Sequence, residues 1–471
     1  MSLPDLRPLL EPESIAVVGA SASPEKAGHV LLRNILDGGF PGDVYPVNPR
    51  EGEIAGQRAY ATVGEVPGAV DLAFVVLGRQ RVLSAVQACA DAGVRAVCII
   101  TAGFGEGDEW GKKEHHNVAA VVAESGMIAI GPNTIGTVSM GGRLLGTFVP
   151  FAHWEDGPVA IGAQTGIFAG PVMVEVMSSN TQRLGVHASV DIGNRVGIDE
   201  LALLEDFAAR KQVEVIGFYL EEFADARAFL ARACEVKLTK PIVVLKSGRT
   251  PQGARASASH TGSHAQDDAV IDQLLRQHGI VRAETAAEFL SLLRGFSYTG
   301  VPAGARIGLI TYSGALGVIA TDELVDHGLE LASLQPSTLQ TIKGLLPDWQ
   351  AARNPSDLWS AAEVDAERTL RVSFDAMLSD PSVDQLLAVM LAVPNIDFAT
   401  FGEAFAALRK KHPSKPIHLV LQGGIKHRWT GAVEGLGIPV YDTTRDAVFV
   451  MAATAHYAAV RDDVPSAHAL S

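Results

Sequence analysis

Cysteine is scarce in this sequence, which contains three, Cys89, Cys98 and Cys234, and no CxxC pair. An odd number of widely spaced cysteines is typical of a protein from a reducing compartment. Positive charge is also in deficit, because 38 lysines and arginines face 53 aspartates and glutamates. The net charge of −15 argues against general binding to nucleic acid or to an anionic membrane. It does not exclude a small anionic ligand, because backbone N–H groups at helix N-termini bind phosphate.

Long apolar runs and a secretory leader are missing as well. The longest apolar runs have the length of a strand and fall short of the roughly 18 residues that a membrane helix needs. The start, MSLPDLRPLLEPESIAVVG, has no basic segment followed by an apolar one, so we expect no signal peptide. These features together predict a soluble, cytoplasmic protein that binds neither nucleic acid nor membranes.

The sequence does have a regular alternation of short apolar runs with amphipathic helical stretches. The runs that read as strands are 14–19, 71–78, 96–103, 158–162, 215–221, 241–248, 306–314 and 415–424. Continuous apolar strands separated by helices predict parallel sheets that are covered on both faces. A chain of 471 residues, 47% of them hydrophobic, is long enough for about three such α/β domains. Breaks near 141–158 and 295–305 place the domains at 1–145, 150–297 and 303–471.

The second and third predicted domains repeat one design. Both open with a strand, a small-residue turn and the start of a helix, at PVAIGAQTGIFAG 158–170 and RIGLITYSGALG 306–317. Later in the chain, KPIVVLKSG 240–248 corresponds to KPIHLVLQGG 415–424. After this strand the second domain has an additional segment, which contains SASHTGSHAQDD 257–268. The carboxyl end of a strand, where this insertion lies, is the usual place for a ligand in α/β folds.

The first candidate site is VVGASASPEKAGHVLLRN, residues 17–34. A buried strand that runs through a small-residue loop into a helix points the helix N-terminus at a phosphate. The loop is not GxGxxG, and Asn48 stands where a dinucleotide enzyme carries an acid for the ribose hydroxyls. The pattern therefore favours another adenosine-phosphate ligand over NAD, with Ser21 and Lys26 near the phosphate. The alternative is an ordinary strand-to-helix turn that binds nothing.

Two turns in the repeated domains are candidate phosphate sites. Thr165–Gly166 and Ser313–Gly314 each place a hydroxyl and a glycine where a helix is expected to begin. The backbone N–H groups and the helix dipole would attract an anion there, and two equivalent turns could hold one phosphate together. The alternative is that Thr165 and Ser313 only cap their helices.

Two histidines, His260 and His264, lie four residues apart in SASHTGSHAQDD. This spacing suits a metal on a helix, but Thr261–Gly262 disfavours a helix there and further ligands are missing. An imidazole exposed on a small-residue loop suits a general base or a nucleophile, although a lone loop histidine is more often inert. The strand end YLEE 219–222 places two carboxylates at the edge where the loops gather. Glu221, the nearer to the strand, is the better candidate to orient a histidine.

Motifs along nearly the whole chain resemble the α subunit of NDP-forming acyl-CoA synthetases, which include ADP-forming acetate–CoA ligase and are related to succinyl-CoA synthetase. The motifs are VVGAS, VYPVNP, TAGFGE, GPNTIG, DIGNRVGIDE, YLE, KPIVVLKSGRT, SHTGS, GLITYSG and NPSDL. The resemblance implies three Rossmann-like or flavodoxin-like parallel-sheet domains, of which the first binds coenzyme A. It also implies an acid–thiol ligase that interconverts acyl-CoA, phosphate and ADP with a carboxylate, CoA and ATP.

The same resemblance implies roles for particular residues. It makes His260 a phosphohistidine and Glu221 the acid that steadies it. The phosphate contacts that it implies are Gln164, Thr165 and Gly166 in one turn and Ser313 and Gly314 in the other. The CoA contacts that it implies are Gly19, Ser21, Lys26 and Asn48.

Nucleotide binding is expected to depend on a second chain. This sequence has no G-x-x-x-x-G-K-[ST] loop and no obvious ATP-grasp module, so the resemblance implies a hetero-oligomer with an ATP-grasp β subunit that binds ADP or ATP with Mg²⁺. Several positions depart from the family pattern; among them, Ala163 replaces a serine and His264 stands where leucine is usual. A non-catalytic or regulatory CoA-binding protein of the same fold is the main alternative. A nicotinamide-dependent oxidoreductase is a second, which Asn48 argues against.

Overall fold

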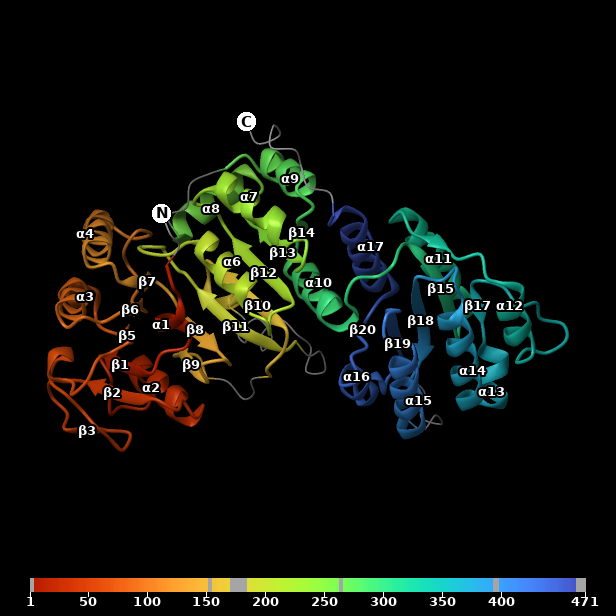
Figure 1. Ribbon diagram of the computed structural model, residues 1–471, viewed down its shortest axis with the longest axis horizontal. Helices are drawn as coiled ribbons and strands as arrows, with labels where there is room; N and C mark the ends of the chain where they lie inside the picture. The colour runs from red at the N-terminus through yellow and green to blue at the C-terminus, as the bar shows by residue number, and fades with distance from the viewer. Residues whose placement is uncertain (1–3, 151–154, 170–183, 262–265, 393–397, 463–471) are drawn as a thin grey trace. The chain divides into compact units, whose positions relative to one another are not determined.

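A computed structural model describes residues 4–150, 155–169, 184–261, 266–392 and 398–462. They belong to two compact units (Figure 1). Unit 1 comprises Met1–Met177, Leu184–Ala286 and Pro465–Ser471, and unit 2 comprises Ser178–Arg183 and Ala287–Val464. Both units consist of mainly parallel sheets with helices, which confirms the predicted fold class. None of the helices in the described residues has both the length and the apolar character that crossing a membrane requires.

The first sheet of unit 1 is parallel and has the strand order β2-β1-β5-β6-β7. Its strands are β1 Ser14–Val18, β2 Asp43–Val47, β5 Leu72–Val75, β6 Ala96–Ile99 and β7 Ile128–Ile130. The accompanying helices are α1 Arg7–Leu10, α2 Ala27–Asp37, α3 Val82–Asp91 and α4 Glu109–Ser125, and a small hairpin is formed by β3 Glu53–Ile54 and β4 Gln57–Arg58. Strands β1, β5, β6 and β7 are buried along their whole length, because they correspond to continuous apolar runs.

The second sheet of unit 1 has the order β14-β13-β12-β10-β11-β8-β9. Its strands are β8 Gly136–Ser139, β9 Leu144–Thr147, β10 Val159–Ala163, β11 Val186–Asp191, β12 Val215–Leu220, β13 Ile242–Lys246 and β14 Val281–Ala283. Its helices are α6 Glu200–Ala209, α7 Ala226–Val236, α8 Pro251–Thr261 and α9 Asp268–Gln277. Strands β10 to β14 pair in parallel, whereas β8 and β9 add an antiparallel edge. Those two edge strands precede residue 150, so part of the chain just before the predicted boundary pairs into the second sheet.

Unit 2 contains the third sheet, in the order β16-β15-β18-β19-β20, with β17 beside β15. Its strands are β15 Arg306–Thr311, β16 Glu330–Leu331, β17 Ser356–Asp357, β18 Gln385–Leu391, β19 Ile417–Gln422 and β20 Val440–Tyr441. Its helices are α10 Ala286–Thr299, α11 Gly314–Asp326, α12 Pro336–Lys343, α13 Trp359–Val364, α14 Ala366–Ser379, α15 Phe398–Lys411, α16 Lys426–Glu434 and α17 Thr444–Val460. Every strand pair in this sheet is parallel.

The second and third sheets share one parallel strand order, β11-β10-β12-β13-β14 and β16-β15-β18-β19-β20. In both, the first strand along the chain lies between the second and the third, so the repeat predicted from the sequence is confirmed. Helix α16 lies between β19 and β20, whereas α8 and α9 lie between β13 and β14. The additional segment of the second domain is therefore a helical insertion. Since α8 follows β13, it begins at the carboxyl edge of the sheet, where α/β folds bind ligands.

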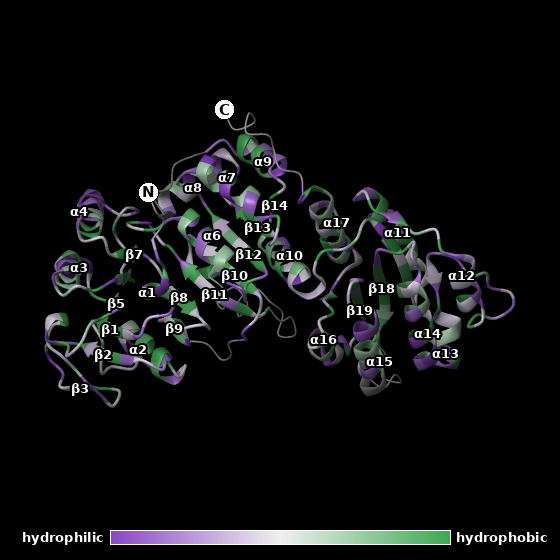
Figure 2. Cartoon of the chain, viewed as in Figure 1, coloured by the Kyte–Doolittle hydropathy of each residue, from purple (hydrophilic) through white to green (hydrophobic). Residues whose placement is uncertain are grey.

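Apolar strands and aspartate caps explain why these elements form where they do. Figure 2 shows the strands β10, β12 and β13 in the green of hydrophobic residues. Five aspartates each precede a helix and accept an N–H of its first turn; they are Asp108, Asp199, Asp225, Asp267 and Asp365. A carboxylate at this position satisfies an unpaired N–H and interacts favourably with the helix dipole.

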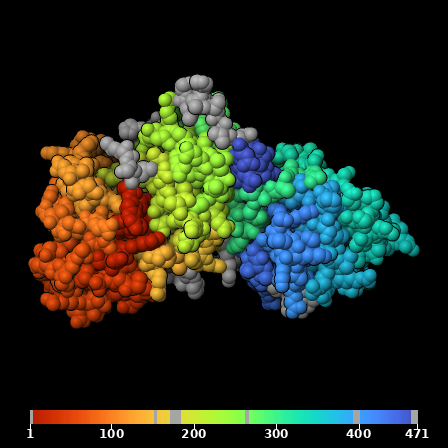
Figure 3. Space-filling view, in the orientation of Figure 1, coloured from red at the N-terminus to blue at the C-terminus, as the bar shows by residue number. Residues whose placement is uncertain are grey.

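The two sheets of unit 1 share one hydrophobic core. This core runs from the N-terminal segment, where Leu6, Leu9 and Leu10 are buried, to residues of both sheets such as Phe74 and Phe218. Figure 3 shows the N-terminal residues in red between the orange surface of the first sheet's part and the yellow-green surface of the second. The continuous core explains why both sheets fall into one compact unit.

A buried ion pair in unit 2 carries a stability prediction. Arg294 on α10 and Glu434 on α16 pair with each other, and both are at most 2% exposed. Arg294→Met would leave the Glu434 carboxylate buried without its cation, which costs about 3–5 kcal/mol. We expect urea titrations followed by the fluorescence of Trp429, which is buried in unit 2, to show this loss.

The matched control is a surface pair in the same unit. Arg371 and Glu367 pair four residues apart on α14, with side chains 37% and 47% exposed. Arg371→Met should change the free energy of unfolding by less than about 1 kcal/mol. Equal losses in the free energy of unfolding for the two variants would contradict the expectation that the buried pair stabilises the protein more than the exposed pair.

Candidate active site

His260 lies in the last turn of helix α8, and not in a loop as the sequence analysis predicted. The alanines and the arginine of the segment ARASASHT favour a helix, so the helix continues to Thr261. Gly262 and His264 lie outside the described residues. The His260 side chain is 54% exposed, so its ring is accessible from solvent.

Glu221 faces His260 at the end of β12. The distance between His260 Nδ1 and Glu221 Oε1 is 2.8 Å, and Glu221 is buried, with 4% of it exposed. A carboxylate at Nδ1 favours the tautomer that carries its proton there, which leaves the lone pair on Nε2. The pair thus combines a fixed ring orientation with a nucleophilic nitrogen.

Two hydroxyl groups hold the Glu221 carboxylate in place. Ser257, one turn earlier on α8, donates a hydrogen bond to Oε2 at 2.6 Å. The Tyr219 hydroxyl lies 3.3 Å from Oε1 and 3.0 Å from the Ser247 hydroxyl. Burial raises the pKa of Tyr219 to about 12, so this hydroxyl keeps its proton. The Phe168 ring stacks on Tyr219 with the ring centroids 4.1 Å apart.

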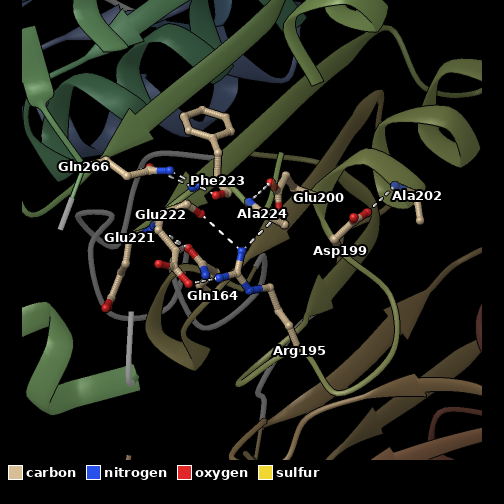
Figure 4. A network of polar contacts seen from close by, with 10 residues as sticks. All are labelled: Gln164, Arg195, Asp199, Glu200, Ala202, Glu221, Glu222, Phe223, Ala224 and Gln266. Atoms are coloured by element: carbon tan, nitrogen blue, oxygen red, sulfur yellow. Dashed lines mark hydrogen bonds and ion pairs between the residues drawn. The ribbon is translucent and has the colours of Figure 1, made fainter. Parts of the chain in front are cut away.

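A polar network fixes the backbone where β12 ends (Figure 4). Gln164 Oε1 accepts the N–H groups of both Glu221 and Glu222, the latter at 3.0 Å. Arg195 pairs with Glu222 and lies 3.3 Å from Glu200. The two carboxylates of YLEE therefore have different partners, because Glu221 contacts the histidine whereas Glu222 contacts an arginine.

Asp191 is a buried acid near this pair. It ends β11 and is 1% exposed. Its carboxylate accepts the N–H groups of Ile135 at 2.8 Å and Gly193 at 3.1 Å. Burial raises the pKa of Asp191 to about 6, although these N–H groups and the charge of His260 oppose the rise. The group therefore titrates close to neutral pH.

We expect Asp191 to make protein stability depend on pH. An unfolded aspartate has a pKa of about 3.9, whereas folding raises it to about 6, so the folded state holds the proton more tightly. The free energy of unfolding therefore falls as the pH rises from about 4 to about 6, by roughly 3 kcal/mol from this group. Asp191→Asn should remove this part of the pH dependence in denaturant titrations. A pH dependence equal to that of wild type would contradict the expectation, and Asp225→Asn at a helix cap is the control.

At the first predicted phosphate turn a 3-10 helix follows Thr165. Thr165 has extended backbone and precedes a 3-10 helix, Gly166–Phe168, and the following residues 170–183 lie outside the described part. A Cβ on Gly166 would lie 2.3 Å from the Ile135 side chain, so only glycine fits there. Gln164 is buried, and its carbonyl oxygen is engaged with the end of β12.

The second predicted phosphate turn lies in unit 2. Helix α11 begins at Gly314 as predicted, and Ser313 precedes it with extended backbone and without a side-chain cap. A Cβ on Gly314 would lie 2.9 Å from Asp357 Oδ2, so a carboxylate of the chain already approaches this helix N-terminus. Asp357 also accepts the N–H of Trp359 at 3.2 Å.

The loop after β1 has the tight geometry that close approach to a ligand requires. Gly19 has φ +98, and a Cβ there would lie 2.2 Å from the carbonyl oxygen of Val76. Asn48 donates from Nδ2 to a carbonyl of this loop at 2.8 Å, and the Ser21 hydroxyl accepts a loop N–H at 3.1 Å. Lys26 is exposed and immediately precedes α2. The structure thus brings the predicted residues Gly19, Ser21 and Asn48 together around one turn.

Sequence reasoning missed two residues of the site. Ser257 lies three positions before His260, a spacing that places both on one face once the segment is helical. Asp191 ends a strand just before a glycine, inside the motif DIGN, and nothing in the pattern indicates its burial. Within the described residues, no group of three His, Cys, Asp or Glu side chains is arranged to hold a metal ion.

Family models match most of the chain. A CoA binding domain matches residues 13–140, a succinyl-CoA ligase like flavodoxin domain matches 156–296, and a Ligase-CoA domain matches 307–465. The α subunit of acetate–CoA ligase [ADP-forming] II from Pyrococcus furiosus is 34% identical over 456 residues, which cover 96% of each chain. The chain belongs to the ADP-forming CoA ligase family. The resemblance seen in the motifs is thereby confirmed.

Other ADP-forming CoA ligases support the assignment. Acetate–CoA ligase [ADP-forming] II from Archaeoglobus fulgidus is 32% identical, over 97% of this chain and 68% of the relative. A structure of acetyl-coenzyme A synthetase 1 from Ca. Korarchaeum cryptofilum, described as dinucleotide forming and in complex with phosphate and ADP, is 33% identical. It covers 97% of both chains with a TM-score of 0.87. Members of this family are ligases that make acyl-CoA.

Proposed function

We propose that this chain is the α subunit of an ADP-forming acyl-CoA synthetase that works in the cytoplasm. It would interconvert acyl-CoA, phosphate and ADP with a carboxylate, CoA and ATP. The observation that carries the proposal is the contact of His260 Nδ1 with the buried Glu221 carboxylate at 2.8 Å, on a helix inserted at the carboxyl edge of a parallel sheet. The free and buried state of all three cysteines supports a reducing compartment.

The reaction divides into three transfers. Phosphate attacks the thioester carbon, the C–S bond breaks, and acyl phosphate and CoA form. His260 Nε2 then attacks the phosphorus, and the P–O bond to the acyl group breaks, which releases the carboxylate. ADP finally takes the phosphoryl group from His260 to give ATP. Positioning and charge stabilisation account for catalysis of such transfers, which require little covalent help from other side chains.

Glu221 assists the second transfer through the ring of His260. As the N–P bond forms at Nε2, the imidazole ring becomes positively charged while Nδ1 keeps its proton. The Glu221 carboxylate accepts that N–H and stabilises the charge. Ser257 and Gln164 keep the carboxylate and its backbone in place.

The turns of the fold are assigned to the substrates. We assign phosphate contacts to Gln164, Thr165, Gly166, Ser313 and Gly314, and CoA contacts to Gly19, Ser21, Lys26 and Asn48. The tight glycines at positions 19 and 166 support close approach of a ligand to the backbone. The family matches support a division into a CoA-binding domain 1–145, a phosphohistidine domain 150–297 and a further ligase domain 303–471.

A partner subunit would complete the enzyme. The name of the Pyrococcus relative, a subunit alpha, supports a second chain in the assembly. We propose that this partner is an ATP-grasp β subunit that binds most of the ADP or ATP together with Mg²⁺. The chain by itself would then catalyse only the steps up to phosphohistidine.

A labelling experiment tests the proposal. The chain is incubated with acetyl-CoA and radiolabelled phosphate, and the protein is analysed for a label that is stable in base and lost in acid. We expect such a label, with release of CoA. CoA binding without any label would favour the non-catalytic alternative, and an absorbance change from a nicotinamide cofactor would favour the oxidoreductase.

A further inference from the structure

Three turns of unit 1 meet around Asp191. The turn 131–136 directs the N–H of Ile135 at Asp191 Oδ2, and the turn 191–194 directs the N–H of Gly193 at Oδ1. Strand β10 pairs with β11 so that Ala163 lies opposite Asp191, immediately before the turn assigned to phosphate. The carboxylate therefore occupies two backbone N–H groups beside the site. Paired N–H groups of this kind commonly bind phosphate oxygens.

We propose that Asp191 is a positioning residue whose protonation controls how well the site accepts the phosphoryl group on His260. The uncharged acid tolerates the phosphoryl charge, whereas the carboxylate repels it. This inference rests on the proposed function, because it concerns the phosphohistidine step.

The charges around Asp191 determine whether its ionisation favours or opposes phosphorylation of His260. Asp191 and His260 lie at the same edge of the sheet, because Ala163 pairs with Asp191 on one side and with Tyr219 on the other, and the Tyr219 hydroxyl contacts Glu221, the partner of His260. Burial raises the pKa of Asp191 to about 6. Transfer of a phosphoryl dianion to His260 adds negative charge at this edge of the sheet. Phosphorylation should therefore favour protonation of Asp191, and by reciprocity an ionised Asp191 should disfavour phosphorylation.

Backbone N–H groups donate hydrogen bonds to the Asp191 carboxylate. In the part of the chain that the structure describes, no lysine or arginine forms an ion pair with it. A further ionisable neighbour is Cys98 on β6, whose pKa is raised by burial and by the Asp191 charge. Ala163 on β10 and Thr134 before β8 are also adjacent, and neither ionises.

The experiment compares the equilibrium fraction of phosphorylated chain in wild type and Asp191→Asn. Each protein is incubated with acetyl-CoA, CoA and radiolabelled phosphate across the range from about pH 5.5 to about pH 8.5. At each pH, the phosphorylated fraction of the variant is divided by that of wild type. This quotient removes the titration of phosphate and of His260, which both proteins share. We expect a quotient near one at the acidic end that rises to about 10-fold at the basic end, because repulsion between partly buried charges has this size.

Controls separate this effect from structural damage. Asp225→Asn, the same change at a helix cap, should give a quotient near one throughout. Asp191→Ser provides a second uncharged side chain, and it should reproduce the pH-dependent rise. A quotient that is independent of pH would overturn the inference, whether it equals one or lies below it. Absence of label from wild type would instead overturn the proposed function, and the inference with it.

Discussion

His260→Ala abolishes the acid-labile phosphate label and lowers acyl-CoA synthesis by about 10³-fold or more. The reason is chemical, because removal of the nucleophile removes the covalent intermediate through which the phosphoryl group passes. The measurements are protein-bound label after incubation with acetyl-CoA and phosphate, and turnover in the presence of the partner subunit. Binding of CoA should persist, since the assigned CoA loop belongs to a different sheet from α8.

Two other histidines serve as controls for this result. His264 shares the segment SASHTGSHAQDD, and His116 is exposed on α4. We expect His264→Ala and His116→Ala to keep the label. Label retained by His260→Ala and lost by His264→Ala would assign the phosphoryl carrier to the second histidine and contradict the proposal.

Glu221→Gln lowers the rate of phosphohistidine formation by about 10²-fold, since an amide neither fixes the Nδ1–H tautomer nor stabilises the charged ring. The Michaelis constant for CoA should stay unchanged, because Glu221 is assigned no contact with that substrate. Rapid mixing with acetyl-CoA and labelled phosphate, stopped in base, measures the rate. A reduced affinity for CoA with an unchanged rate of labelling would contradict the role of Glu221.

A graded series identifies the effect as electrostatic. Ser257→Ala removes one hydrogen bond from the Glu221 carboxylate, so we expect a smaller loss of about 3- to 10-fold. Glu235→Gln neutralises an exposed carboxylate on the same unit, with a side chain 71% exposed, and should leave the rate unchanged. Equal losses for Ser257→Ala and Glu221→Gln would indicate disruption of the helix instead.

Much of the fold followed from periodicity. The predicted strands 14–19, 158–162, 215–221, 241–248 and 415–424 coincide with β1, β10, β12, β13 and β19. Continuous apolar runs of this length identify buried parallel strands because both faces of such a sheet are covered. The short edge strand β16 and the antiparallel pair β8 and β9 were not predicted, since their residues are partly polar and their pairing depends on neighbours far along the chain.

The prediction that failed locally is the loop around His260. Thr261–Gly262 was interpreted as disfavouring a helix there, yet α8 extends through His260 to Thr261. This difference matters because the helix places Ser257 and His260 on the same carboxylate.

The sequence by itself determined the α/β class, the repeat of the second and third sheets, the family and the histidine to test. These properties are local or periodic, so they are visible as patterns along the chain. Only the tertiary structure decided that Ser257 holds the Glu221 carboxylate that contacts His260, and that Asp191 is buried among backbone N–H groups. Strand order brings these residues together from segments far apart in the chain, and burial then shifts the pKa of Asp191. Neither effect leaves a trace in the spacing of the residues themselves.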